Sequence, residues 1–426
     1  MQSYATSIAR GLKQVDHESD ALTRLCRDLI RYPTENPPGI CTEVMMYIKD
    51  WLNDHGIHSR LYKKEKNKEN LVSNLSRPTD QSLIFYGHAD VVAAGDRKRW
   101  SFSPYSGKVT AGKILGRGAT DMKGGLAALM FAFKTVAQLD LKLSKNLQLI
   151  VVPDEENFDP KKKLLYTMID DGIASGMACI MGEPTSPQGI AVGDKGDLWL
   201  RMTAVGTPAH GSAPVMGDNA ILRLNKSLDD LTKIEREGVP VPPELRSVVR
   251  LSKGMVRQYA AAAGYRDRAK LAEKLVTHTS VNVGTVHGGT MTNIVPESAQ
   301  AEIALCLPPG EPARQALKHV KTLVGGNAGV KVTATFGMDP NWTRPNLPVV
   351  KALQFASRSV MNVTPKPFLS TGSSDAHAFR LRGIPTVWFG PGDISGAHSY
   401  DEYVRVKELV AFAKTYFQTA IRLCAS

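Results

Sequence analysis

The stretch LIFYGHAD, residues 83–90, joins a short apolar run to two polar side chains, His88 and Asp90. The run from Leu83 to Tyr86 is apolar or aromatic throughout, which is typical of a strand buried on both faces of a parallel sheet. A histidine at the end of such a strand, followed two residues later by an aspartate, needs an explanation. One such site means little, so the interpretation depends on whether other apolar runs end in the same way.

Other apolar runs in the chain also end on side chains that can bind a metal ion. In a parallel α/β sheet the carboxyl ends of the strands meet at one edge, where ligands bind, so these side chains should lie together. Asp121 fits the same pattern, because it directly precedes a helical segment that begins near Met122. The further runs are LIVVP (149–153) before Glu155 and Glu156, CIMG (179–182) before Glu183, and VWFGPGDISGA (387–397) before His398.

Imidazoles and several carboxylates at one edge of a sheet require a balancing charge. Carboxylates that lie close together repel and raise each other's pKa, and a divalent metal ion removes this conflict. Nitrogen and oxygen ligands without thiolate fit zinc, with manganese or cobalt as alternatives. Each residue alone has an ordinary explanation, such as a helix cap for Asp121, a solvated loop for Glu155 and Glu156, or a surface turn for Glu183. Their joint placement favours a metal centre.

The length and the pattern of the chain predict two domains. A chain of 426 residues exceeds one ordinary core. Apolar runs alternate with helical patterns in the outer parts, which predicts an α/β fold with a largely parallel central sheet flanked by helices. The middle contains half-buried, alternating strands around helix-rich sequence, which predicts an inserted α+β domain. We expect a catalytic domain formed by residues 1–194 and 311–426, and an inserted domain formed by residues 195–310.

The composition is that of a soluble globular protein, with 42% hydrophobic and 22% charged residues. The formal net charge of +12 raises the possibility of nucleic-acid binding, which a gel shift at two salt concentrations would test. The basic runs at 62–70 and 160–164 are short and carry no interleaved aromatic residues, so a solvated surface and no nucleic-acid partner are expected. No apolar run reaches the ~20 residues of a membrane helix. The first 20 residues contain no apolar signal region, so we expect no membrane contact and a cytoplasmic protein.

The cysteine pattern argues against both disulfides and a thiolate metal site. The 5 cysteines are irregularly spaced and include no CxxC pair. We expect reduced, partly buried thiols.

Seven motifs in a fixed order carry a resemblance to a known family. The chain resembles the superfamily of two-zinc amidohydrolases and metallopeptidases that includes acetylornithine deacetylase, succinyl-diaminopimelate desuccinylase, aminoacylase and glutamate carboxypeptidase. The resemblance extends from about residue 20 to the C-terminus. The motifs are GHADVV (87–92), GRGATDMKGGLAA (116–128), PDEE (153–156), MGEPT (181–185), GTPAHGSAP (206–214), NIVPESAQAEI (293–303) and GPGDISGAHSYDEYV (390–404).

The resemblance implies a role for each metal-binding candidate. His88 and Glu183 would hold one metal ion, Glu156 and His398 would hold the other, and Asp121 would bridge both. The expected cofactor is Zn²⁺, two ions per subunit, with Co²⁺ or Mn²⁺ as alternatives.

The resemblance also implies roles for residues around the metal ions. Asp90 would orient His88, since metal-bound imidazoles usually donate their other N–H to such a partner. Glu155 would be the general base. His210, in the inserted domain, would donate a hydrogen bond to the oxyanion in the active site of the partner subunit of a homodimer. Asn293 would contact the substrate from the same domain.

One position departs from the family pattern. Many relatives have an arginine in the strand before the PPG-like turn, where it binds a substrate carboxylate, and this chain has Cys306 there. A thiol cannot make the paired, charge-assisted bonds of arginine. Either another cation such as Lys195, Arg344 or Arg380 replaces it, or the substrate lacks that carboxylate.

The segment STGSSDAHAF, residues 370–379, matches the family loop that lies near the substrate. Gly372 and Ser373 are candidates for binding a substrate carboxylate through a backbone N–H and a hydroxyl. His377 is unusual at its position and is either a polar surface residue or a specificity contact.

We expect a metal-dependent hydrolase that cleaves the amide bond of a small N-acyl amino acid or a related N-acylated amine. A metal-dependent dipeptidase or carboxypeptidase is the alternative within enzymes. A binding protein that has lost catalysis is a third interpretation, but the complete ligand set argues against it.

Overall fold

The structure is a computed structural model and describes residues 4–139, 141–157, 163–262 and 264–425. The chain forms two compact units. Unit 1 comprises Met1–Val192, Thr343–Phe368 and Ser374–Ser426, and unit 2 comprises Gly193–Trp342 and Leu369–Ser373. None of the helices in the described part of the chain has the length and apolar character needed to cross a membrane.

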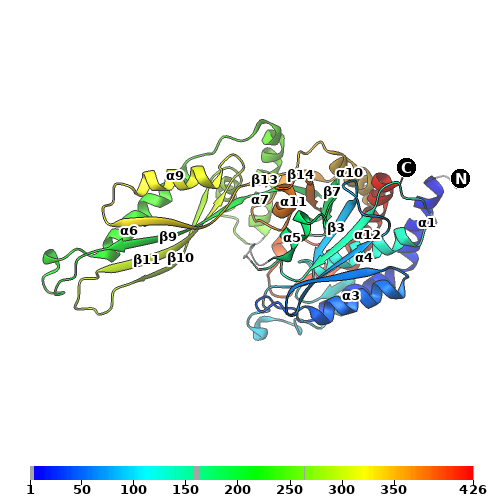
Figure 1. The fold of residues 1–426 in the computed structure, drawn as a ribbon, viewed down its shortest axis with the longest axis horizontal. Helices are drawn as coiled ribbons and strands as arrows, with labels where there is room; N and C mark the ends of the chain where they lie inside the picture. Colours follow the sequence, from blue (N-terminus) through cyan, green and yellow to red (C-terminus); the bar gives the residue numbers. More distant parts are fainter. Residues whose placement is uncertain (1–3, 140, 158–162, 263, 426) are drawn as a thin grey trace. The chain divides into compact units, whose positions relative to one another are not determined.

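A mixed sheet forms the centre of unit 1 (Figure 1), with the strand order β1-β2-β6-β3-β7-β15-β8. The four strands β6, β3, β7 and β15 are parallel to one another, and the remaining pairs are antiparallel. These strands are β1 (Ser59–Glu65), β2 (Lys68–Asn74), β3 (Leu83–His88), β6 (Leu147–Val152), β7 (Ala178–Met181), β8 (Gly189–Asp194) and β15 (Thr386–Trp388).

The parallel strands are buried because helices cover the sheet. All six residues of β3 and all six of β6 are buried, as their largely apolar sequences predict. The central helix α4 packs on β3 and β6 and contacts α1, α2 and α12, while α3 packs on β1 and β2. The α-helices of unit 1 are α1 (Tyr4–His17), α2 (Ser19–Ile30), α3 (Thr42–Asp54), α4 (Lys123–Ala137), α5 (Leu164–Asp170), α10 (Pro348–Met361), α11 (Ala376–Arg380) and α12 (Val406–Cys424). The expected α/β fold is confirmed, while the central sheet, which was expected to be largely parallel, is a mixed sheet with four parallel strands at its centre.

Short elements complete unit 1. A small antiparallel sheet has the order β16-β5-β4, and β14 pairs with β8. These elements are β4 (Lys108–Thr110), β5 (Lys113–Leu115), β14 (Lys366–Leu369), β16 (Tyr403–Arg405), and the 3₁₀ turns η1 (Arg97–Arg99) and η6 (Ile394–Gly396).

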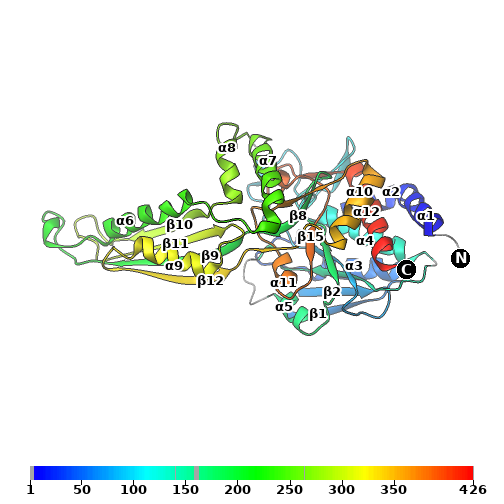
Figure 2. The ribbon, with the colours of Figure 1, turned by 90° about the horizontal axis from the view of Figure 1, so that it is seen from above.

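Unit 2 is built on an antiparallel sheet with the order β10-β11-β9-β12. The helices α6 and α9 lie along this sheet (Figure 2), where α6 packs on β9 and β11 and α9 packs on β9 and β12. In β11, buried and less buried residues alternate, so one face of the strand enters the core. The strands are β9 (Gly196–Val205), β10 (Ser280–Gly288), β11 (Ser298–Leu307) and β12 (Val330–Met338). The short strand β13 (Asn341–Trp342) instead pairs with β8 of the central sheet.

The helical part of unit 2 lies mainly between α6 and β10. Its elements are α6 (Ala220–Thr232), α7 (Arg246–Ala262), α8 (Ala269–Ala272), α9 (Ala313–Val324), and the 3₁₀ turns η2 (Pro214–Met216), η3 (Lys233–Arg236), η4 (Pro243–Leu245) and η5 (Glu273–Val276).

The end of unit 2 differs from the position expected from the sequence. Residues 311–342, which we assigned to the catalytic domain, lie in unit 2. The physical reason is the pairing of β12 with β9, which brings α9 onto the same core through Ala316, Val320 and Val324. Sequence periodicity shows a helix and a strand in this region but does not show which sheet the strand joins.

Candidate metal centre

The candidate metal-binding side chains lie beyond the carboxyl ends of the parallel strands. His88 ends β3, Glu155 and Glu156 follow β6, and Glu183 follows β7. Asp121 precedes α4, and His398 follows β15 through the turn η6. Because β6, β3, β7 and β15 are neighbours and parallel, their ends meet at one edge of the sheet in unit 1.

Asp121 lies between two histidines. Its Oδ1 is 3.1 Å from Nε2 of His88, and its Oδ2 is 3.3 Å from Nε2 of His398. His398 Nε2 is also 3.2 Å from Oε1 of Glu156. One carboxylate that faces two imidazoles with different oxygens is the arrangement a bridging metal ligand requires.

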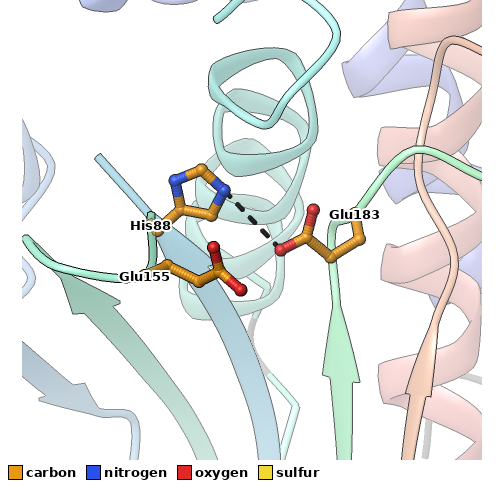
Figure 3. A group of neighbouring side chains, drawn as sticks. All are labelled: His88, Glu155 and Glu183. Atoms are coloured by element: carbon orange, nitrogen blue, oxygen red, sulfur yellow. Dashed lines mark ion pairs between the residues drawn. The ribbon is translucent and has the colours of Figure 1, made fainter. Parts of the chain in front are cut away.

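A second carboxylate completes the surroundings of His88. Its Nε2 lies 3.6 Å from Oε1 of Glu183, and Figure 3 shows the ring directed at Glu183 with Glu155 beside them. Two groups of three side chains could each hold a metal ion, because the ligand atoms within each group lie within 4.8 Å of one another. One group is His88, Glu155 and Glu183, and the other is His88, Asp121 and Glu156. The buried Oε1 of Glu183 has no hydrogen-bond partner among the described residues. A buried acceptor left without a donor fits a cation ligand.

The electrostatics of the cluster favour a balancing positive charge. Burial raises the pKa of Glu155 to about 8, and the nearby carboxylates Asp375 and Glu156 add to this effect. Burial also raises the pKa of Glu183 well above its usual range, with the Asp121 carboxylate as the next cause. Hydrogen bonds to Asp121 and Glu156 raise the pKa of His398 to about 10. Each of these shifts favours the protonated form of its group, and a divalent cation bound among the same atoms would oppose the shifts.

Asp90 supports the cluster mainly by accepting hydrogen bonds from main-chain N–H groups of the loop after β6. Its Oδ1 accepts from the N–H of Glu155 at 3.2 Å, and its Oδ2 accepts from the N–H of Glu156 at 3.0 Å and from Nδ2 of Asn36 at 2.8 Å. The Nδ1 of His88 is 2.9 Å from the main-chain oxygen of Asp90 and 3.5 Å from its Oδ1. The aspartate thus fixes the loop after β6, while the nearer acceptor for His88 is the peptide oxygen.

Glu402 and Arg117 hold Asp121, and the sequence analysis did not identify either residue. Glu402 Oε1 accepts from the N–H of Thr120 at 2.8 Å and of Asp121 at 3.0 Å, and its Oε2 lies 2.6 Å from Nη1 of Arg117. Glu402 belongs to the motif at 390–404, and Arg117 to the motif at 116–128, so the signal was present in the sequence.

The remaining candidates belong to unit 2. His210 and Asn293 are exposed and lie on neighbouring segments, since the N–H of Gly211 donates to the main-chain oxygen of Asn293 at 2.7 Å. The Nδ1 of His210 is 2.7 Å from Oγ of Ser212. The structure therefore places these two residues together within their own unit.

The donors of the loop at 370–373 are engaged inside unit 2. The N–H of Gly372 donates to Oγ of Ser370 at 3.1 Å, and the hydroxyl of Ser373 donates to Oδ2 of Asp197 at 2.6 Å. Cys306 is 3.8 Å from the other oxygen of Asp197. All five cysteines are free, as expected.

Of the cations considered as replacements for an arginine, only Lys195 lies in unit 2 with Cys306. It is 3% exposed, and its Nζ is 3.3 Å from the main-chain oxygen of His278 and 3.4 Å from Oγ of Ser280. Ser280 and Cys306 are direct partners in the β10–β11 pairing. Arg344 and Arg380 belong to unit 1.

A comparison with protein families assigns the chain. Residues 84–422 match the sequence pattern of the peptidase family M20/M25/M40. The chain belongs to this family. Members of the M20 family are metal-dependent hydrolases, and the His, Asp and Glu cluster of unit 1 is the candidate metal site of this member.

Curated relatives of this M20 chain include desuccinylases. A probable succinyl-diaminopimelate desuccinylase of Staphylococcus epidermidis is 28% identical over 406 residues, covering 92% of this chain and 95% of the relative. The succinyl-diaminopimelate desuccinylase of Rhodospirillum centenum is 33% identical over 214 residues, covering 48% of this chain and 54% of the relative.

Experimentally determined structures confirm the M20 fold. The metallo-carboxypeptidase Sso-CP2 of Sulfolobus solfataricus has a TM-score of 0.77 at 23% identity, covering 92% of this chain and 97% of its own. Human carnosine dipeptidase 1 has a TM-score of 0.69 at 18% identity, covering 97% of this chain and 98% of its own.

Proposed function

We propose that this M20 chain is a cytoplasmic, two-zinc amidohydrolase that removes the acyl group from a small N-acylated amino acid or amine. The observation that carries the proposal is the position of Asp121, whose two oxygens face His88 and His398 at 3.1 and 3.3 Å. His88 and Glu183 would hold one ion, Glu156 and His398 the other, and Asp121 would bridge them. Co²⁺ or Mn²⁺ is the alternative to Zn²⁺.

The reaction requires a base next to the bound water. Divalent ions in such a site lower the pKa of a water toward about 7 and polarise a carbonyl. Glu155 takes the proton of the attacking water and gives it to the leaving nitrogen, the usual exchange of base and acid. Glu155 holds that proton between the two steps. Asp90 holds the main chain of Glu155 while the proton is taken up and while it is released.

Unit 2 would supply substrate contacts. His210 is proposed to donate a hydrogen bond to the oxyanion in the partner subunit of a homodimer, and Asn293, Gly372 and Ser373 to contact the substrate. The proposed functional division places catalysis in unit 1 and gives unit 2 the roles of lid and dimer interface.

The central experiment is amide hydrolysis by zinc-loaded protein on N-formyl, N-acetyl and N-succinyl compounds, with and without a free carboxylate. We expect turnover in the wild type and a loss of at least about 10³-fold in Glu155→Gln, with unchanged zinc content. Glu69→Gln, a buried glutamate of β2 that accepts from Thr42, is the matched control and should retain activity. Zinc-loaded wild-type protein that hydrolyses no member of the panel would contradict the deacylase assignment.

A dipeptidase or carboxypeptidase is the second candidate. The metallo-carboxypeptidase and the dipeptidase that share its fold support this candidate, whereas Cys306 bears on both candidates alike, because a dipeptide also carries a free carboxylate. Dipeptides with free and blocked termini form the second arm of the panel, and a higher kcat/KM on dipeptides than on all N-acyl compounds would decide for the peptidase.

The role of His210 is tested by mixing subunits. A hybrid dimer of one Glu155→Gln chain and one His210→Ala chain contains one complete site only if His210 acts across the dimer. We expect about half of the wild-type activity in the hybrid and little in either parent. An inactive hybrid would assign His210 to its own subunit.

A further inference from the structure

A buried lysine contacts the main chain of the proposed base. Lys163 directly precedes α5 and is 7% exposed. Its Nζ donates to the main-chain oxygen of Glu155 at 2.8 Å and to Oδ1 of Asp375 at 2.6 Å. The sequence shows it only as the end of a basic run at 160–164 that was expected to be solvated.

Asp375 and Tyr86 hold this lysine in place. Asp375 is 2% exposed, and its Oδ2 accepts a hydrogen bond from the hydroxyl of Tyr86, which is fully buried in β3. The rings of Tyr86 and Phe379 of α11 pack nearly perpendicular to each other, with centroids 5.6 Å apart. The three polar groups therefore form a chain that begins in the central sheet and ends at Glu155.

The Glu155 residue is held from two directions. Its N–H donates to Oδ1 of Asp90, and its carbonyl accepts from Lys163. Glu155 follows β6, outside the hydrogen bonds of the sheet, so these two contacts set the direction in which its side chain leaves the main chain. General base catalysis depends on this direction, because a displacement of about 1 Å can cost about 10²-fold in rate.

The charge of Lys163 alone does not explain the arrangement. If Lys163 served only to balance the charge of Asp375, the 2.6 Å contact between them would be enough. Burying an ammonium group costs free energy, which its hydrogen bonds must offset. The second contact goes to a neutral peptide oxygen that belongs to the residue bearing the base. The geometry therefore links the ion pair to Glu155.

We propose that Lys163, held by Asp375 and Tyr86, is a positioning residue that fixes the main chain of Glu155 for catalysis. The inference rests on the proposed function for the role of Glu155 as the base. It adds three residues to the machinery around the metal centre.

The test compares Lys163→Met with Lys134→Met. Lys134 is a matched control, since it is also a buried lysine of unit 1 that pairs with a carboxylate, Glu18. We expect Lys163→Met to lower kcat about 10–100-fold, with KM within about threefold and zinc content unchanged. Lys134→Met should lower the unfolding temperature without this change in kcat. Lys163→Arg, which keeps the charge, should recover part of the lost kcat.

A second readout does not depend on turnover. Hydrogen exchange of the amides of residues 154–157 should become faster in Lys163→Met and stay unchanged in Lys134→Met. Tyr86→Phe, which removes only the hydroxyl, should shift kcat and exchange in the same direction by a smaller factor, and it serves if Lys163→Met fails to fold.

Each outcome decides the inference. The inference is overturned if the amides of residues 154–157 exchange in Lys163→Met and Tyr86→Phe at the wild-type rate, or if KM rises with unchanged kcat. If the wild type turns over no substrate while the exchange effect is present, the proposed function fails and the positioning contact stands.

Discussion

Asp90 shows how much of a metal centre depends on a residue outside the proposed ligand set. Its carboxylate accepts the N–H groups of Glu155 and Glu156, so one side chain aligns a candidate ligand and the proposed base. We expect Asp90→Ala to lower zinc affinity about 10–100-fold, measured by competition with a chelating indicator. Asp80→Ala, at an exposed position, is the control. Unchanged affinity in Asp90→Ala would mean that the loop after β6 holds its shape without the carboxylate.

Lys195 predicts a pH dependence of stability. Burial lowers the pKa of Lys195 to about 8, against about 10.4 in an unfolded chain. The folded state thus loses the proton first, and the free energy of unfolding should rise between pH 8 and about 10.4, by up to about 2–3 kcal/mol. Urea unfolding at pH 7.5 and 10.5 should show this gain in the wild type relative to Lys195→Met. Lys331→Met, at an exposed position of β12, controls for the lost charge, and equal pH profiles of wild type and Lys195→Met would refute the prediction.

At the residue scale, the sequence singled out most metal-binding candidates because each follows an apolar run, and Asp121 because it precedes a helical segment. It did not locate Lys163 as a functional residue, because its partner Asp375 is 212 residues away in the chain. A local basic run has the same appearance whether its last lysine is solvated or buried. His377 was left open between surface and specificity roles, and at 7% exposure it is not a surface residue.

At the scale of elements, three glycines let α4 approach the strand ends. A Cβ on Gly125 of α4 would lie 1.9 Å from the main-chain oxygen of Gly182, and a Cβ on Gly390 would lie 2.1 Å from the same oxygen. Gly182 directly precedes Glu183. The helix and two strand ends therefore meet through backbone alone, and this contact places the carboxylate of Glu183.

We expect Gly125→Ala to displace the end of β7, and so to lower both stability and zinc affinity. The loss of stability should be on the order of 1–3 kcal/mol, as for other overpacked cores. Thermal unfolding and a zinc competition assay measure the two effects. Gly254→Ala in α7 has nothing within 4 Å of the new Cβ and should be neutral or stabilising. If Gly125→Ala is less stable than the wild type but keeps its zinc affinity, the close contact at Gly125 supports packing and does not position the metal ligands.

The types of most elements followed from periodicity, but pairing did not. The fully buried β3 and β6 and the long α4 were expected from largely apolar runs and helical spacing. The strand β12 has an alternating, largely exposed pattern, and it joins β9 across more than a hundred residues of chain. Such long-range pairing is decided by tertiary packing, which a local pattern does not contain.

At the scale of the whole molecule, the proposed ligands all belong to unit 1, while unit 2 has its own core. A bound metal stabilises only the folded form of the unit that binds it. We expect a chelator to lower the unfolding temperature of the unit 1 transition in calorimetry and to leave a unit 2 transition in place. Leu200→Ala, in the unit 2 core, should destabilise unit 2 by about 2–5 kcal/mol and identify its transition. A chelator effect confined to the transition that Leu200→Ala shifts would contradict this assignment.

The sheet order of unit 1 has a consequence for synthesis. β15 lies between β7 and β8, although β8 ends at Asp194 and β15 begins at Thr386. While the ribosome makes the intervening residues, the place between those two strands is unfilled, and both present unpaired edges. His398 emerges later still, so the nascent chain cannot offer a complete ligand set. We therefore expect zinc to be loaded only after His398 has emerged, and chains cut short before Thr386 to aggregate and depend on chaperones.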